Sequence, residues 1–72
     1  MHFNYTIPLR AFLENGGNLN AVQIVLTDSL LSQKYQLVTR NKNALTIKNA
    51  VTGEETRSHV DVCWVIVKVS WE

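Results

Sequence analysis

The sequence predicts an α+β fold, in which a short N-terminal strand and two helices precede an antiparallel β-meander. Apolar and polar residues alternate with the period of a strand near the N-terminus and again from Tyr35 onward, whereas the segment between them carries helix-capping signals. The 72 residues, 46% hydrophobic and 18% charged, fit one domain over residues 1–72. A chain of this length buries only about 60% of its unfolded surface.

The first strand and the first helix meet at Pro8. Alternation predicts a strand that ends there, because proline lacks the N–H that a sheet interior requires and suits the first turn of a helix. The apolar positions of this strand are Phe3, Tyr5 and Ile7. The short helix that follows has one apolar face, formed by Leu9, Phe12 and Leu13. Residues 15–17, Asn-Gly-Gly, can adopt the positive φ that ends a helix.

A second helix is predicted from about Ala21 to Ser32. Asn20, followed three residues later by Gln23, fits a capping box, which marks the start of a helix. Residues 21–27 are nevertheless rich in β-branched side chains, which favour a strand. A strand there is the alternative, and it would make the fold a small, five-stranded SH3-like barrel.

Residues 34–50 predict a basic β-hairpin, because two alternating runs flank Asn41-Lys42-Asn43. The side chains expected to face the core are Tyr35, Leu37, Leu45 and Ile47. Those expected to face solvent are Lys34, Gln36, Arg40, Thr46 and Lys48. With Lys42, the segment carries four positive charges and no acidic residue, so the solvent face is predicted to be positive. The other three basic residues stand against six acidic ones, which leaves −3 on the rest of the chain.

The last run of the chain changes its apolar parity. Val60, Val62, Trp64 and Ile66 are even-numbered, whereas Val65, Val67, Val69 and Trp71 are odd-numbered. One strand cannot turn both sets inward, so a break is expected near residues 63–65. The end of the run is strongly apolar, with Lys68 its one charge. It therefore predicts a protein interface, whose proposed residues are Val67, Val69 and Trp71.

No catalytic, metal or cofactor site is predicted. His59, Asp61 and Cys63 are chemically suitable, but residues four apart on a strand lie about 13 Å apart, so His59 could not activate Cys63. A single cysteine excludes an intramolecular disulfide and cannot alone hold a structural zinc ion. The chain also contains no nucleotide-binding loop. These observations favour binding over catalysis.

The sequence also predicts a cytoplasmic protein that does not contact membranes. Its N-terminus lacks the basic and apolar segments of a secretory signal. The longest apolar run covers residues 62–67, whereas a helix that spans a bilayer needs about 20 residues.

Two stretches are similar to known families. Residues 9–23, LRAFLENGGNLNAVQ, resemble the first helix and turn of some bacterial helix-turn-helix regulators, and the basic hairpin would take the place of a wing. Residues 34–62, KYQLVTRNKNALTIKNAVTGEETRSHVDV, resemble the strand pattern of SH3-like barrels, including the nucleic-acid-binding terminal module of retroelement integrases. Both similarities are local and neither assigns the chain to a family. Both imply contact with nucleic acid.

The leading hypothesis is a small, non-enzymatic accessory or regulatory protein that binds DNA or RNA through its hairpin. Its phosphate contacts would come from Lys34, Arg40, Lys42 and Lys48. The net charge of +1 is too small for a protein that coats DNA. The alternative is a protein-interaction module, an inhibitor or adaptor of viral or phage type. Its C-terminal strand would add to a partner's sheet or form a homodimer.

Overall fold

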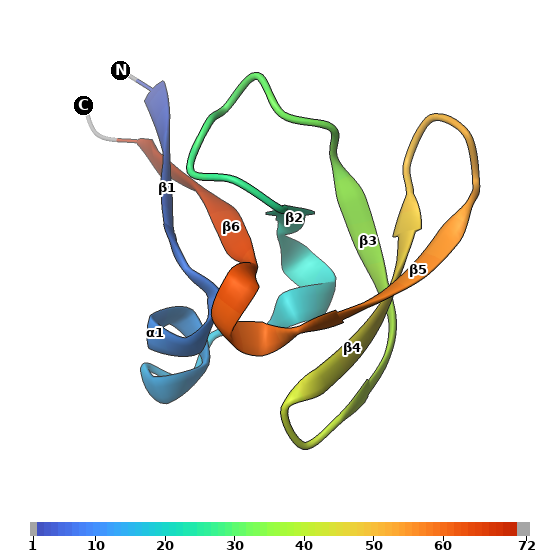
Figure 1. The fold of residues 1–72 in the computed structure, drawn as a ribbon. Helices are drawn as coiled ribbons and strands as arrows, with labels where there is room; N and C mark the ends of the chain where they lie inside the picture. The colour runs from blue at the N-terminus through green and yellow to red at the C-terminus, as the bar shows by residue number, and fades with distance from the viewer. Residues whose placement is uncertain (1, 71–72) are drawn as a thin grey trace.

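Six strands form one open antiparallel sheet in the computed structural model, which describes residues 2–70 (Figure 1). The strands are β1 (His2–Pro8), β2 (Gln23–Val25), β3 (Tyr35–Asn41), β4 (Ala44–Asn49), β5 (Glu55–His59) and β6 (Trp64–Ser70). Their order across the sheet is β1-β6-β2-β3-β4-β5. The edges β1 and β5 do not pair with each other, so the sheet is not a closed barrel.

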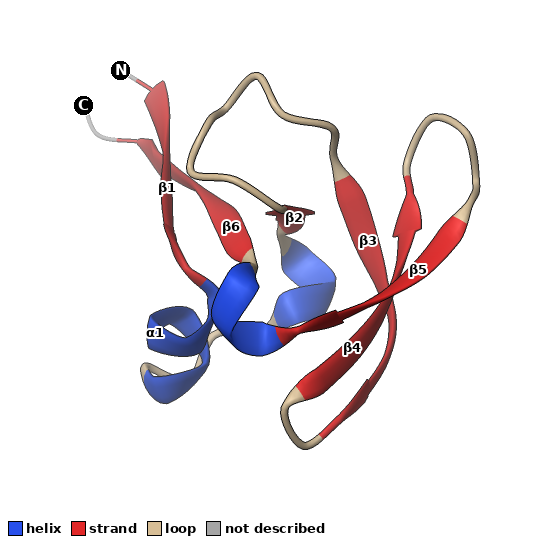
Figure 2. Ribbon diagram, in the orientation of Figure 1, coloured by secondary structure: helices blue, strands red, loops and turns tan. Residues whose placement is uncertain are grey.

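Helical structure is limited to one short helix and two single turns in the part of the chain that is described (Figure 2). Helix α1 spans Leu9–Glu14, and the 3₁₀ turns span Leu19–Ala21 and Val60–Val62. The prediction of a small α+β domain with an antiparallel sheet is confirmed. The predicted N-terminal strand and first helix are confirmed as well, and Gly16 after α1 has the positive φ, 78°, that glycine readily adopts.

The predicted second helix is wrong. β2 lies between β6 and β3, with Ile24 opposite Val65 on one side and opposite Tyr35 on the other. Ile24 and Val25 are both fully buried, although consecutive strand residues point to opposite faces. Burial on both faces and pairing with two strands therefore outweigh the capping box, which is worth about 1 kcal/mol.

The segment after β2 is a loop over residues 26–34. The hydroxyl of Thr6 donates to the carbonyl oxygen of Asp28 at 2.8 Å, which fastens the loop to β1. Within the loop, the hydroxyls of Thr27 and Ser32 bond to each other. Short hydroxyl side chains of this kind compete with helical hydrogen bonds, which gives a second reason why no helix forms here.

The core lies on one face of the sheet, where α1 and both 3₁₀ turns contribute to it. Its buried residues are Leu9, Leu19, Ile24, Leu45, Ile47, Val60, Cys63 and Val65. The backbone N–H of Leu9 donates to the carbonyl of Cys63 at 3.0 Å, so the start of α1 is attached to the chain just before β6. No helix in residues 2–70 is long and apolar enough to cross a membrane.

The last run does contain a break, but it lies at residues 60–63, just before the predicted position at residues 63–65. β5 ends at His59, the chain makes the 3₁₀ turn Val60–Val62, and β6 begins at Trp64. The turn reorients the chain, because within β6 the odd-numbered Val65 is buried in the core. Trp64 on the opposite face pairs with Val25. β6 nevertheless still carries apolar side chains of both parities, and it can do so because Val65 lies on the core face while Trp64 lies opposite the buried Val25 on the other face.

Candidate nucleic-acid interface

The predicted basic hairpin is confirmed as β3 and β4. Asn41 pairs with Ala44, so residues 42 and 43 form a two-residue turn in which Lys42 has a φ of 51°. Leu45 and Ile47 are buried in the core, and Tyr35 and Leu37 pack against it. The predicted core face of the hairpin is therefore correct.

A β-bulge at Val38 changes the predicted solvent face. Leu37 pairs with Ile47, but Thr39 pairs with Thr46, so one extra residue lies between these pairs on β3. A shift of one residue reverses the faces beyond it. Arg40 consequently lies opposite the core residue Leu45, whereas the sequence placed it on the same face as Lys48. Arg40 is exposed, but on the other side of the sheet.

Arg57 of β5 lies on the solvent face of the sheet, where Arg40 was expected. Directly opposed residues of an antiparallel pair share a face. Arg57 lies opposite Thr46, which lies opposite Thr39, and all three are on the face away from the core. We call this surface of β3, β4 and β5 the outer face. The sequence-based prediction left Arg57 outside the hairpin, although its alternation with Thr56 and Ser58 is the signal that could have placed it.

Lys48 also lies on the outer face, but it has an acidic neighbour. It pairs with Gln36 of β3 on one side and with Glu55 of β5 on the other. Lys48, Glu55 and Arg57 are all exposed. Together with Lys42 in the turn, the outer face has three positive charges and one negative charge.

A shallow groove of about 240 Å³ crosses the outer face near the turn. Its polar lining comes from Thr39, Asn41, Thr46 and Arg57. Within the described chain, none of these four side chains makes a hydrogen bond to another residue. Two hydroxyls, one amide and one guanidinium are therefore available to a ligand with acceptor oxygens.

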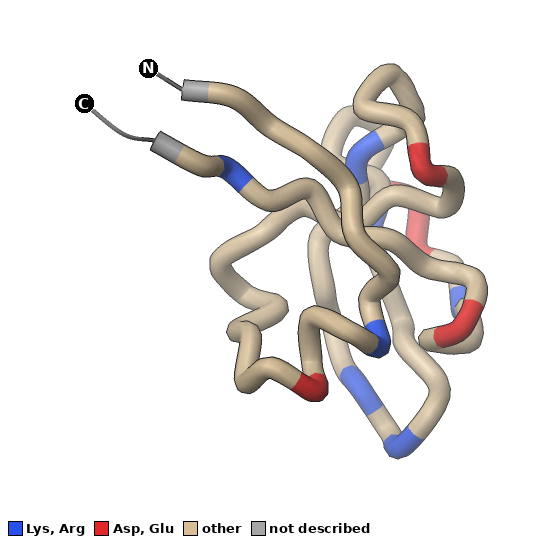
Figure 3. Tube along the Cα trace, turned by 90° about the vertical axis from the view of Figure 1, so that its left-hand side faces the viewer, with Lys and Arg blue, Asp and Glu red and all other residues tan. Residues whose placement is uncertain are grey.

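Lys34, the fourth predicted contact, is engaged by the loop before β3. Its ammonium group donates to the carbonyl oxygens of Leu30 and, at 2.6 Å, of Ser32. The side chain is partly buried there. The basic residues as a whole are spread over several parts of the molecule (Figure 3). The positive surface is therefore smaller than the sequence suggests.

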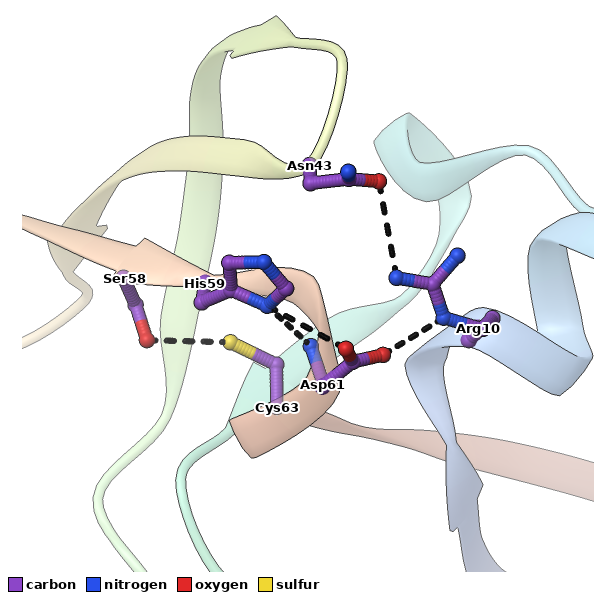
Figure 4. A network of polar contacts seen from close by, with 6 residues as sticks. All are labelled: Arg10, Asn43, Ser58, His59, Asp61 and Cys63. Carbon is purple, nitrogen blue, oxygen red and sulfur yellow. Dashed lines mark hydrogen bonds and ion pairs between the residues drawn. The ribbon is translucent and has the colours of Figure 1, made fainter.

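A polar cluster joins α1 to the hairpin turn and to the 3₁₀ turn before β6 (Figure 4). The guanidinium of Arg10 donates through Nε to Asp61 Oδ1 at 2.5 Å and through Nη2 to Asn43 Oδ1 at 3.4 Å. The hydrogen bond to Arg10 lowers the pKa of Asp61, and the same bond raises the pKa of Arg10. The cluster thus connects three elements that are distant in sequence.

His59 and Cys63 take different partners in this cluster. His59 Nδ1 accepts a hydrogen bond from the backbone N–H of Asp61 at 3.1 Å. The thiol of Cys63 is buried and donates to the hydroxyl of Ser58 at 3.4 Å. Burial raises the pKa of this thiol, which disfavours the reactive thiolate. No group of three or more metal-ligating side chains forms among residues 2–70.

The predicted interface residues lie at the other end of the sheet. Val67 pairs with Tyr5 and Val69 with Phe3, and both valines are partly buried. Because β1 runs along one whole side of β6, the strand that presents an open edge here is β1. The third predicted residue, Trp71, lies outside the described residues.

No protein-family model, curated protein or solved structure matches this chain.

Proposed function

We propose that the protein binds nucleic acid through the outer face of β3, β4 and β5, with phosphate contacts from Lys42, Lys48 and Arg57. The observation that carries this proposal is the register of the meander, in which Lys48 and Arg57 share one exposed surface with the groove. Arg40 is a peripheral contact in this arrangement, since the bulge turns it to the other side of the sheet.

The chemistry of the groove fits phosphate. Arg and Lys attract phosphate by charge, and hydroxyl and amide groups donate hydrogen bonds to its oxygens. Thr39, Thr46 and Asn41 supply these donors beside Arg57. Contacts of this kind hold the backbone of a nucleic acid and read little sequence, so the expected binding is electrostatic and weakly sequence-dependent.

A titration monitored by fluorescence anisotropy tests the proposal. Labelled single- and double-stranded DNA and RNA of unrelated sequences are titrated with protein at several salt concentrations. Three neutralised phosphates predict a slope of about −3 for the logarithm of the association constant against the logarithm of salt concentration, and the four nucleic acids show which form binds best.

Four variants separate the outer face from general charge. Lys48→Ala combined with Arg57→Ala is expected to weaken binding to every sequence and to reduce the salt slope by about 2. Lys68→Ala, which removes an exposed charge from β6, serves as the matched control and should leave the slope unchanged. Arg40→Ala should have a smaller effect than Arg57→Ala. Wild-type affinity in the folded double variant would contradict the proposal.

A further inference from the structure

β1 is an edge strand of the sheet, and Pro8 at its end is its one residue without a backbone N–H. It is seven residues long and pairs with β6 in one unbroken register, without a bulge. It contains no Asp, Glu, Lys or Arg. Between Asn4 and Ile7, no backbone group makes a hydrogen bond to any described residue except those of β6. Natural edge strands normally carry charges, bulges or a covering segment that prevents pairing with another chain.

β5, the opposite edge, is protected by its own sequence. If two β5 strands paired antiparallel about their centre, Arg57 would face Arg57, and like charges placed directly opposite are destabilising. If two β1 strands paired in the same way, Tyr5 would face Tyr5 and Asn4 would face Thr6. The β1 sequence is therefore compatible with itself across a two-fold axis.

We propose that a second copy of this chain pairs antiparallel with β1, so that the two sheets become one continuous sheet. The occupant is a copy because a two-fold axis at Tyr5 supplies residues 3–7 with uncharged partners from the same strand. β1 is an end strand of the sheet and lies beside β6 (Figure 1).

The side chains of β1 support this pairing. Phe3, Tyr5 and Ile7 share one face, and the rings of Phe3 and Tyr5 lie with their centroids 5.9 Å apart. Tyr5 is 39% exposed, although it lies on the same face as the core. Two-fold pairing would bring Phe3, Tyr5 and Ile7 of one copy beside the same residues of the other copy. In each copy these side chains lie next to Val67 and Val69 of β6, so the apolar surface would continue across the interface.

Sedimentation velocity over a concentration series up to about 1 mM tests the dimer, without nucleic acid present. The wild-type protein should shift from monomer to dimer as its concentration rises. Tyr5→Lys places two like charges at the two-fold axis and should weaken the dimer at least about tenfold. Thr56→Lys, at an exposed position on β5, is the matched control and should leave the dimer unchanged. A wild-type protein that stays monomeric would overturn the proposal.

Cross-linking through an introduced cysteine tests the same pairing even if Tyr5→Lys unfolds the protein. Under mild oxidation, Tyr5→Cys should form a cross-linked dimer, because directly opposed residues lie close enough for an S–S bond. Asn4→Cys faces Thr6 of the other copy and should cross-link much more slowly. Cys63 is buried and should not take part. Equal cross-linking of the two variants, or none, would contradict the pairing about Tyr5.

Discussion

The two edges of the sheet differ in how they meet solvent. β5 has Glu55, Arg57 and His59 on its outer face, whereas β1 has no side chain that is charged at neutral pH in its residues 3–7. The same sheet therefore has one edge that carries charged side chains and one edge that, over residues 3–7, carries none. The proposed nucleic-acid surface includes β5 and the proposed dimer surface is β1, so the two surfaces lie at opposite ends of the sheet.

The strands beside these edges show the same contrast. β4, the central strand of the meander, buries Leu45 and Ile47 on one face and carries Thr46 and Lys48 on the other, the usual pattern of an antiparallel sheet. β6 has apolar side chains on both faces, with Val65 toward the core and Trp64 opposite the buried Val25. Alternation in the sequence predicts a strand that is buried on one face. A strand with apolar side chains on both faces needs other segments of the chain to cover both.

The largest expected effect concerns β2, which joins the two regions. Ile24→Ala should lower the free energy of unfolding by about 2–5 kcal/mol, because it leaves a cavity at a fully buried position. Thr56→Ala, at an exposed position, should change it by less than about 0.5 kcal/mol. Urea denaturation measures both. If both variants lost a similar amount of unfolding free energy, Ile24 would not be a core residue. The helix predicted over residues 21–32 would then be favoured.

A smaller effect is expected at Asn49, which ties the meander to the loop over residues 26–34. Its carboxamide oxygen accepts from the backbone N–H groups of Val51 and Thr52, and its amide group donates to Gln33. Asn49→Ala should cost about 1–3 kcal/mol of unfolding free energy, since it leaves polar groups without partners. The exposed Asn41→Ala is the matched control in the same denaturation series. A cost no greater than that of the control would show that this tie contributes little.

The smallest effect concerns the pair of Arg10 and Asp61, which connects α1 to the turn before β6. The pKa of Asp61 is lowered in the folded protein, so the carboxylate stabilises the fold above its unfolded pKa of about 3.8 and loses this contribution as pH falls. Asp61→Asn should therefore melt slightly below the wild type at about pH 6, and the gap should narrow below about pH 4.

Thermal melts monitored by circular dichroism at several pH values measure this gap. Because both side chains are exposed, the expected difference is small and should shrink further in high salt. Glu14→Gln, which removes an exposed carboxylate from α1, controls for the loss of charge. A gap that widens toward low pH would contradict the direction of the Asp61 pKa.

Elements that depend on neighbouring residues could be predicted well. The first strand is predicted by alternation that ends at Pro8, and α1 by one apolar face followed by a glycine. The hairpin is predicted by two alternating runs around a short turn. The parity change near Cys63 likewise predicted a break, because a strand has only two faces. Each of these signals lies within a few residues of the structure that it predicts.

The candidate site was predicted only in part. Lys42 lies in the predicted turn and Lys48 on the predicted solvent face, but Lys34 is held by the carbonyls of Leu30 and Ser32. Arg57 was not predicted, because its place beside Thr46 depends on the register between β4 and β5. The bulge at Val38 turned Arg40 to the core side of the sheet, and one inserted residue is enough to do so.

The sequence by itself determined the local elements of this protein, the break in its last run and the absence of charge on β1. Tertiary structure decided that residues 23–25 form a strand, because a helix cap and β propensity are each worth only about 1 kcal/mol and the pairing with β6 and β3 outweighs them. It also decided which basic residues share a face. Register is a relation between two strands, so no single run of sequence contains it.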